Sequence, residues 1–170
     1  MPCTRVTRSS GTRRAVSGFT LIELMVTLVI AAILAMVALP AYQSTLRKSV
    51  RQVASRTLIE LAAQQETVKA GPTRGYAKNF DDLVGISGTT VYVNRSGQYS
   101  ATLGSDSIYK LTLDDIVSNA AGRVTAYSLT AAAVGNQAKD SACKSLKLTS
   151  TGVKTATGTA SDLMRECWSG

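Results

Sequence analysis

The stretch Gly18-Phe19-Thr20-Leu21-Ile22-Glu23 lies between an arginine-rich N-terminus and a long apolar run. From Phe19 to Leu39 the only ionisable side chain is Glu23. About 20 apolar residues are enough to cross the hydrocarbon core of a bilayer. Burying a lone acid at that depth costs free energy, so such an acid marks a functional site and should have a partner. The sequence therefore predicts a membrane-compatible helix in which the carboxylate of Glu23 has a partner.

The segment from Gly18 to Met25, continued by Val37-Ala38-Leu39-Pro40-Ala41-Tyr42, resembles the start of a type IV pilin without gaps. In that family a prepilin peptidase of the inner membrane cuts after the glycine and methylates the new N-terminus. The resemblance implies cleavage between Gly18 and Phe19, with N-methylation of Phe19. It also implies that Glu23 pairs with the N-terminal amine of a neighbouring subunit during assembly.

Electrostatics gives Glu23 a compatible role by a separate route. An N-terminal amine with a pKa near 8 and a carboxylate with a pKa near 4 are both charged in water. Burying either group alone is expensive, whereas burying them together recovers much of the cost. A single-span anchor is an alternative, but it leaves Glu23 unexplained. A cleaved signal peptide is another, but no small-x-small site follows the apolar run, so we expect the run to stay in the mature protein.

Removal of residues 1–18 as a leader leaves a chain long enough for one compact domain and a long helix. The formal charge falls from +8 to +4 because all four charged leader residues are arginines. This mild excess permits acidic partners without requiring them. The chain contains no histidine, so the commonest general base and metal ligand is missing.

The helical pattern continues beyond the membrane run. We expect an apolar half at 19–42 and an amphipathic half at 43–70, ended by Gly71-Pro72. Pro40 should kink or loosen the helix near Met36. The apolar stripe of the second half consists of Leu46, Val50, Val53, Ala54, Leu58, Leu61 and Val68. The opposite, solvent-facing side should carry Arg47, Lys48, Arg51, Arg56 and Glu60.

Residues 71–170 have the pattern of a globular head made of short strands. Residues Tyr109 to Leu113, Tyr127 to Ala133 and Leu146 to Leu148 each alternate apolar with polar side chains, as half-buried strands do. Val91 and Val93, or Tyr99 to Leu103, are candidates for an edge strand, and Gly71 to Gly88 should be a loop. The predicted fold class is α+β, with an antiparallel sheet laid on the amphipathic half of the helix.

Cys143 and Cys167 remain once Cys3 leaves with the leader, and disulfides persist in the periplasm and outside the cell. A bridge between them would contribute roughly 3–4 kcal/mol by chain-entropy arguments; two unpaired thiols are the alternative. In type IV pilins such a disulfide-bounded segment, here 143–167, is called the D-region. The ending Cys167-Trp168, with Leu146 to Gly152 before it, resembles PilE-like minor pilins in particular.

Catalytic patterns are weak. Ser141-Ala142-Cys143-Lys144 fits Ser-x-x-Lys, but the companion motifs of that chemistry are missing. The pairs Asp81-Asp82 and Asp114-Asp115 lie in no glycine-centred calcium loop, and no phosphate-binding glycine loop with a following lysine is present. We therefore expect no enzymatic activity, no cofactor and no metal site.

The resemblance implies a subunit of a type IV pilus, most simply a minor pilin acting in twitching, adhesion or DNA uptake. Its partners would be other pilins, the prepilin peptidase and the assembly machinery, first in the inner membrane and later in the extracellular pilus. One alternative is a minor pilin that binds DNA in natural transformation, with Lys144, Lys147 and Lys154 as candidate phosphate contacts. A pseudopilin of type II secretion is another alternative.

Overall fold

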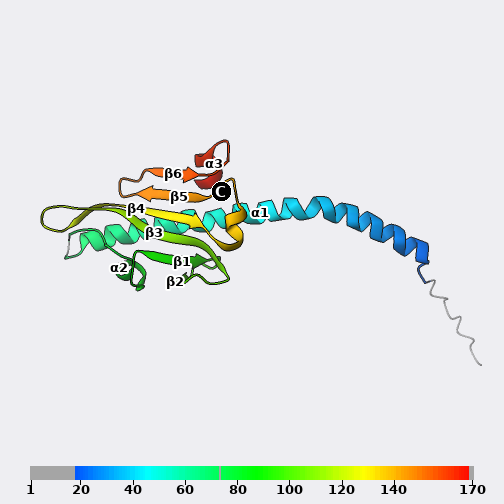
Figure 1. The fold of residues 1–170 in the computed structure, drawn as a ribbon, viewed down its shortest axis with the longest axis horizontal. Helices are drawn as coiled ribbons and strands as arrows, with labels where there is room; N and C mark the ends of the chain where they lie inside the picture. The colour runs from blue at the N-terminus through cyan, green and yellow to red at the C-terminus, as the bar shows by residue number, and fades with distance from the viewer. Residues whose placement is uncertain (1–17, 73, 169–170) are drawn as a thin grey trace, which may run out of the picture. The chain divides into compact units, whose positions relative to one another are not determined.

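The computed structural model describes residues 18–72 and 74–168 of the chain. Its first element is helix α1, Leu21–Ala70, which is followed by nine shorter elements (Figure 1). The leader 1–18, with Cys3, lies outside the described residues except for Gly18. By contacts the chain divides into two compact units, with the boundary between Pro40 and Ala41, and each is described separately below.

The first unit contains the apolar half of α1. Thr20 caps the helix, since its hydroxyl accepts a hydrogen bond from the Glu23 amide at 3.3 Å. The side chains from Phe19 to Leu39 are exposed, and an 18-residue window of α1 has a mean hydropathy of 2.7. By length and composition this helix is suited to crossing a membrane. The helix assignment continues through Pro40, so the kink near Met36 stays a prediction.

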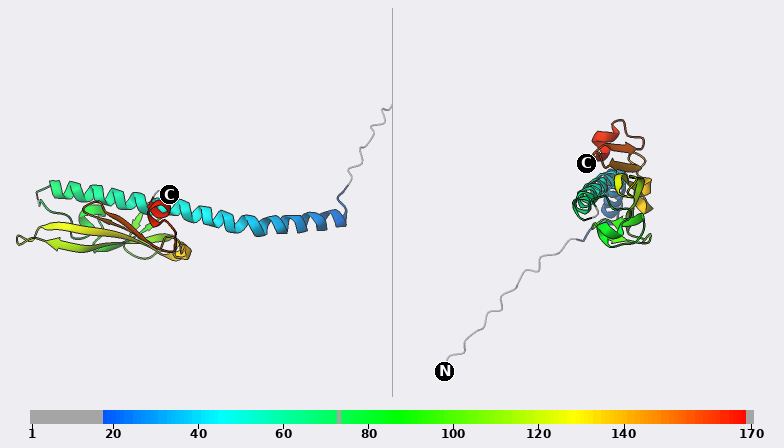
Figure 2. Two further views of the ribbon diagram at one scale, coloured as in Figure 1. Left: turned by 90° about the horizontal axis from the view of Figure 1, so that it is seen from above. Right: turned by 90° about the vertical axis from the view of Figure 1, so that its left-hand side faces the viewer.

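The second unit is a six-stranded sheet with the amphipathic half of α1 along one face (Figures 1 and 2). The strands are β1 Thr90–Asn94, β2 Tyr99–Ser100, β3 Ser107–Ser118, β4 Val124–Ala133, β5 Ser145–Thr149 and β6 Lys154–Thr157. The remaining elements are α2 Asp81–Val84, the 3-10 helix η1 Gly135–Lys139 and α3 Leu163–Trp168. Every neighbouring pair is antiparallel, in the order β2-β1-β3-β4-β5-β6. The α+β prediction is confirmed.

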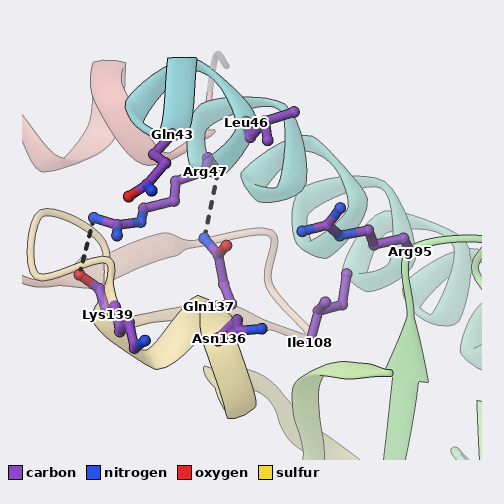
Figure 3. Close-up of a pocket in the computed structure, with 8 residues that line it drawn as sticks. All are labelled: Gln43, Leu46, Arg47, Arg95, Ile108, Asn136, Gln137 and Lys139. Carbon is purple, nitrogen blue, oxygen red and sulfur yellow. Dashed lines mark hydrogen bonds between the residues drawn. The ribbon is translucent and has the colours of Figure 1, made fainter. Parts of the chain in front are cut away.

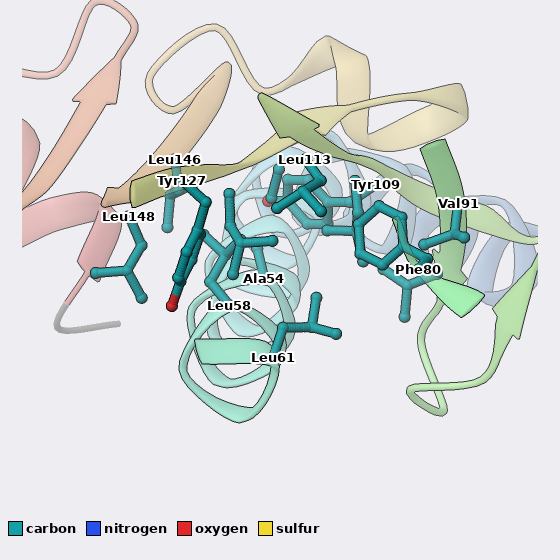
Figure 4. Packing of buried hydrophobic residues seen from close by; sticks show 14 of the residues in the cluster. Ala54, Leu58, Leu61, Phe80, Val91, Tyr109, Leu113, Tyr127, Leu146 and Leu148 are labelled. Carbon is teal, nitrogen blue, oxygen red and sulfur yellow. The ribbon is translucent and has the colours of Figure 1, made fainter. Parts of the chain in front are cut away.

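The hydrophobic core lies between α1 and the sheet (Figure 4). Ala54, Leu58 and Leu61 of α1 are fully buried, as are Tyr109 and Leu129 of the two central strands. The predicted alternation holds in β3, β4 and β5, where residues facing α1 are buried and most of their neighbours are partly exposed, although Ser128 of β4 is also buried. All core residues lie between Val50 and Cys167, so the unit from Ala41 contains a complete core.

The predictions for this unit need correction in detail. Arg51 was expected on the solvent side of α1, but it is only 5% exposed because Asp140 provides a buried counterion. Of the two candidates for an edge strand, Tyr99 to Leu103 contains the edge strand β2, whereas Val91 and Val93 lie in β1, which β2 covers. The predicted loop 71–88 contains the short helix α2, and β6 was not predicted.

The predicted disulfide is present. Cys143 and Cys167 are bonded with their Cα atoms 5.7 Å apart, and both are buried. Cys167 lies in α3 and Cys143 lies two residues before β5, so the loop that the bridge closes contains β5 and β6. The chain returns so close to Ala142 that a Cβ at Gly158 would overlap its carbonyl group, and Gly158 has φ +152°. Glycine is therefore required at that turn.

Candidate nucleic-acid interface and assembly segment

The Gly18-Phe19 junction is sterically open. A Cβ built on Gly18 meets no atom within 4 Å, and the Phe19 side chain is 80% exposed. The fold of the described chain therefore imposes no need for glycine at residue 18.

Glu23 lies in the first turn of α1, where a carboxylate interacts favourably with the helix dipole. Thr20 and Glu23 have the spacing of a capping box, although the Glu23 carboxylate has no hydrogen-bond partner within residues 18–72 and 74–168. Helix capping accounts for the backbone contact to Thr20. It leaves the acidic side chain available.

The three lysines predicted as DNA contacts do not share one surface. Lys147 is paired with Thr155 across β5 and β6, whereas Lys154 is paired with Leu148, whose side chain faces the core. Because side chains alternate along a strand, Lys147 points to the outer face of the sheet and Lys154 to the opposite side. Lys144 precedes β5 and is exposed.

Lys154 is engaged with the C-terminal helix. Its ammonium lies 5.1 Å from the ring centroid of Trp168, and the Trp168 indole N–H donates to the Thr155 carbonyl at 3.0 Å. This cation–π contact fixes α3 on β6. Lys154 therefore has a structural role in the D-region.

Lys147 is engaged with the bulge of β3. Its Nζ donates to Asp115 Oδ2 at 2.6 Å, and the Ser128 hydroxyl donates to the same oxygen at 2.7 Å. The register of β3 shifts at this point and Asp115 has φ +51°, so the bulge aims its carboxylate at Lys147. The hydrogen bonds from Lys147 and Ser128 hold the pKa of Asp115 below its usual value.

The outer face of the sheet carries a cation that sequence analysis missed. Lys110 alternates with the buried Tyr109 and Leu111, so it points away from α1, and it is paired with Tyr92 and Ala132. The alternation that predicted β3 already contained this signal. Threonines share the face, in a row across five strands: Thr90, Thr112, Thr130 and Thr155, with Lys147 between the last two.

Among the described residues, no group of three or more histidine, cysteine or acidic side chains is arranged to hold a metal ion. Among the described residues of the second unit, Arg51 and Asp140 form a buried ion pair. The Arg51 Nε lies 2.6 Å from Asp140 Oδ2 and its Nη2 lies 2.7 Å from Oδ1. The hydrogen bond to Asp140 raises the pKa of Arg51, in opposition to desolvation.

A long N-terminal helix, a six-stranded antiparallel sheet against its second half and a C-terminal disulfide match the type IV pilin fold. Residues 13–39 match the prokaryotic N-terminal methylation motif. Residues 40–147 match the family described as "Type IV minor pilin ComP, DNA uptake sequence receptor". The chain is also 32% identical to the type IV major alpha-pilin of Moraxella bovis over 132 residues, which cover 78% of this chain and 77% of the relative.

The chain therefore belongs to the type IV pilin family, within the group of ComP minor pilins. It is a minor pilin of a type IV pilus, with the N-terminal methylation motif of that family. This confirms the resemblance drawn from Gly18 to Met25. It also favours a pilus subunit over a pseudopilin of type II secretion.

Proposed function

We propose that this minor pilin presents a DNA-binding head on a type IV pilus and takes part in DNA uptake. The observation that carries the proposal is the match of residues 40–147 to a family described as a DNA uptake sequence receptor. The matched range contains β1 to β4 and extends to Lys147 in β5. The outer face of the sheet therefore falls almost entirely within it.

The outer face has the groups that a phosphate backbone needs. Lys110 has no acidic partner among the described residues, and Thr112 follows it on the same face. Lys147 is paired with Thr130 and Thr155. The two lysines are separated by two strand spacings and two residues, about 12 Å between Cα atoms, which is comparable to the width of the major groove. Both ammonium groups can therefore contact the backbone of one duplex.

Fluorescence anisotropy of the head fragment 41–170 with a labelled duplex tests this proposal. Phosphate contacts release counterions, so binding should weaken linearly on a log–log plot against salt. Lys110→Gln and Lys147→Gln should each reduce that slope by about 1. Lys78→Gln is the matched control, because Lys78 is exposed and lies in the segment between α1 and α2, on neither β3 nor β5.

Lys144→Gln and Lys154→Gln test the alternative hypothesis that DNA lies along the disulfide loop. A reduced slope in these variants, with Lys110→Gln unchanged, would move the interface to that loop. Salt-independent binding would rule out the phosphate contacts of Lys110 and Lys147. No binding at all would remove the DNA-binding role and leave a structural pilus subunit.

We also infer that the chain is matured by prepilin peptidase between Gly18 and Phe19 and anchored in the inner membrane by residues 19–42. The open junction supports this inference, because the need for glycine then comes from the enzyme and not from the fold. Gly18→Leu should leave uncleaved precursor in the membrane, whereas Thr20→Ser should be processed. A methylated Phe19 terminus in the Gly18→Leu protein, seen by mass spectrometry, would contradict the assignment.

For assembly, we propose that the Glu23 carboxylate forms an ion pair with the N-terminal amine of a neighbouring subunit in the filament core. Residues 43–70 and the head 71–170 would lie outside that core. The unpartnered carboxylate in the first turn of α1, judged within the described ranges, supports this role. The assembly machinery and other pilins are the proposed partners. No catalytic role is proposed.

A further inference from the structure

A basic pocket lies at the end of the head where α1 enters it (Figure 3). Its volume is about 270 Å³. Arg47 comes from α1, Lys139 and Asn136 from η1, and Arg95 from the turn after β1. Figure 3 shows the Arg95 side chain extending toward the cavity from the side opposite η1. We name these four residues the basal pocket.

The cations of the basal pocket are not neutralised within the described chain. No acidic residue lines the pocket. The Arg47 guanidinium donates to the Lys139 carbonyl at 3.4 Å, and neither Arg95 nor the Lys139 ammonium has an ion-pair partner within residues 18–72 and 74–168. Figure 3 shows the Arg47 guanidinium on the side of the Lys139 carbonyl and the Arg95 guanidinium on the opposite side, so an anion between them would be attracted by both arginines.

Three acids line the hollows that adjoin the basal pocket. Asp140 holds the buried Arg51, and the Glu166 carboxylate accepts from the Ser161 hydroxyl. Asp106, in the adjoining hollow, accepts from the Asn94 amide at 2.9 Å. Glu166 and Asp106 keep their negative charge because Ser161 and Asn94 are neutral donors, but none of the three acids lines the basal pocket itself.

The position of the pocket along α1 indicates which anion is nearest. Tyr42, at the end of the apolar run, is 64% exposed, as aromatic residues at a membrane interface are. Arg47 follows five residues later, about 7.5 Å along the helix. The headgroup layer of a bilayer extends roughly 5–7 Å beyond the hydrocarbon core. The long side chain of Arg47 can therefore reach the level of lipid phosphates.

We propose that the basal pocket binds the phosphate of an anionic phospholipid while the subunit is still anchored in the membrane. Arginine guanidinium groups suit this ligand because they donate two parallel hydrogen bonds to phosphate oxygens. The amide of Asn136 adds a neutral donor. The site is separate from the proposed DNA interface, because α1 lies on the inner face of the sheet and Lys110 and Lys147 lie on the outer face.

Vesicle co-sedimentation of the head fragment 41–170 tests the proposal. Vesicles of phosphatidylglycerol and phosphatidylcholine in equal parts should bind the fragment, and phosphatidylcholine alone should not. The triple variant Arg47→Gln/Arg95→Gln/Lys139→Gln should bind the anionic vesicles on the order of 100-fold more weakly, since each cation near an anionic surface contributes about fivefold. The matched control Arg74→Gln/Lys78→Gln/Arg123→Gln removes the same charge from the loops after α1 and between β3 and β4.

The outcomes separate the possible ligands. Equal loss in both triple variants would mean unspecific attraction and would overturn the proposal. Equally strong binding to inorganic phosphate, without preference for anionic vesicles, would point to free phosphate and overturn it as well. Loss of duplex binding with vesicle binding intact would assign the pocket to DNA, and loss only of incorporation into pili would assign it to a neighbouring subunit. Unchanged thermal melting of both variants excludes misfolding as the cause.

Discussion

Replacing Asp140 with asparagine is the sharpest test of how the head holds α1. The Arg51 and Asp140 side chains are only 6% and 4% exposed, and two short hydrogen bonds join them. The substituted amide would keep the shape but remove the charge, and it would present an N–H where Arg51 needs an acceptor. Removing one partner of a buried ion pair costs about 3–5 kcal/mol, because the remaining charge stays desolvated.

The cost should be visible in urea unfolding of the oxidised fragment 41–170, followed by circular dichroism. We expect Asp140→Asn to lose about 3 kcal/mol, which corresponds to roughly 10 °C in Tm for a head of this size. The contacts of Gln137 should weaken with it, since its amide donates to Asp140 Oδ2 at 3.1 Å and to Tyr109 Oη at 3.4 Å. The effect therefore reports on the junction of α1, η1 and β3.

The double variant Arg51→Met/Asp140→Leu is the matched control. It removes both charges and fills their volume with apolar atoms, so it should be within about 1 kcal/mol of the wild type. Arg47→Met, one turn earlier and more exposed, should change stability by less than about 0.5 kcal/mol. A loss below about 1 kcal/mol in Asp140→Asn, or a double variant as unstable as the single one, would refute the reasoning.

Three further predictions concern other parts of the chain. Cys167→Ser should destabilise the head by about 3 kcal/mol. Reduction of the Cys143–Cys167 bond should destabilise the wild type equally and leave the variant unchanged. Equal stability of the oxidised wild type and the variant would rule this out. Glu23→Val should be processed normally but depleted from sheared pili, so wild-type amounts in purified pili would contradict the pairing role. Burial raises the pKa of both Tyr109 and Tyr127 to about 12. Folding then favours the neutral forms of both tyrosines, so the stability of the head should hold below pH 10 and fall between pH 10 and about 12. If phenolate absorbance of the folded head rose near pH 10 for all its tyrosines, this prediction would be excluded.

The strands that face α1 could be predicted because their pattern is local. Leu111, Leu129 and Leu146 each sit between polar neighbours, and a period of two leaves one assignment of faces. Strand β6 gave no such signal, since Lys154 to Thr157 has a single partly buried residue and lies at the edge of the sheet. Its place depends on pairing with β5 and on the disulfide, which are contacts over a longer range.

The burial of Arg51 depends on both local and distant information. Its spacing from Ala54 and Leu58, three and seven residues, is that of the buried stripe, so the helical period already placed it on the inner face. Its charge argued for solvent, and the counterion that overrules the charge is 89 residues away. Sequence analysis gave no partner for Arg51, because nothing in a single sequence shows which acid meets which base.

The two faces of the sheet explain how one head can serve a filament and a ligand. The inner face is covered by α1, and the buried pair Arg51 and Asp140 fixes the helix there. Lys110 and Lys147 lie on the outer face, which α1 does not cover. Lys147 is held by Asp115 in the free head, so a phosphate must compete with a carboxylate at 2.6 Å. Lys110 has no such competitor among the described residues, and for that reason it should contribute more to DNA affinity than Lys147.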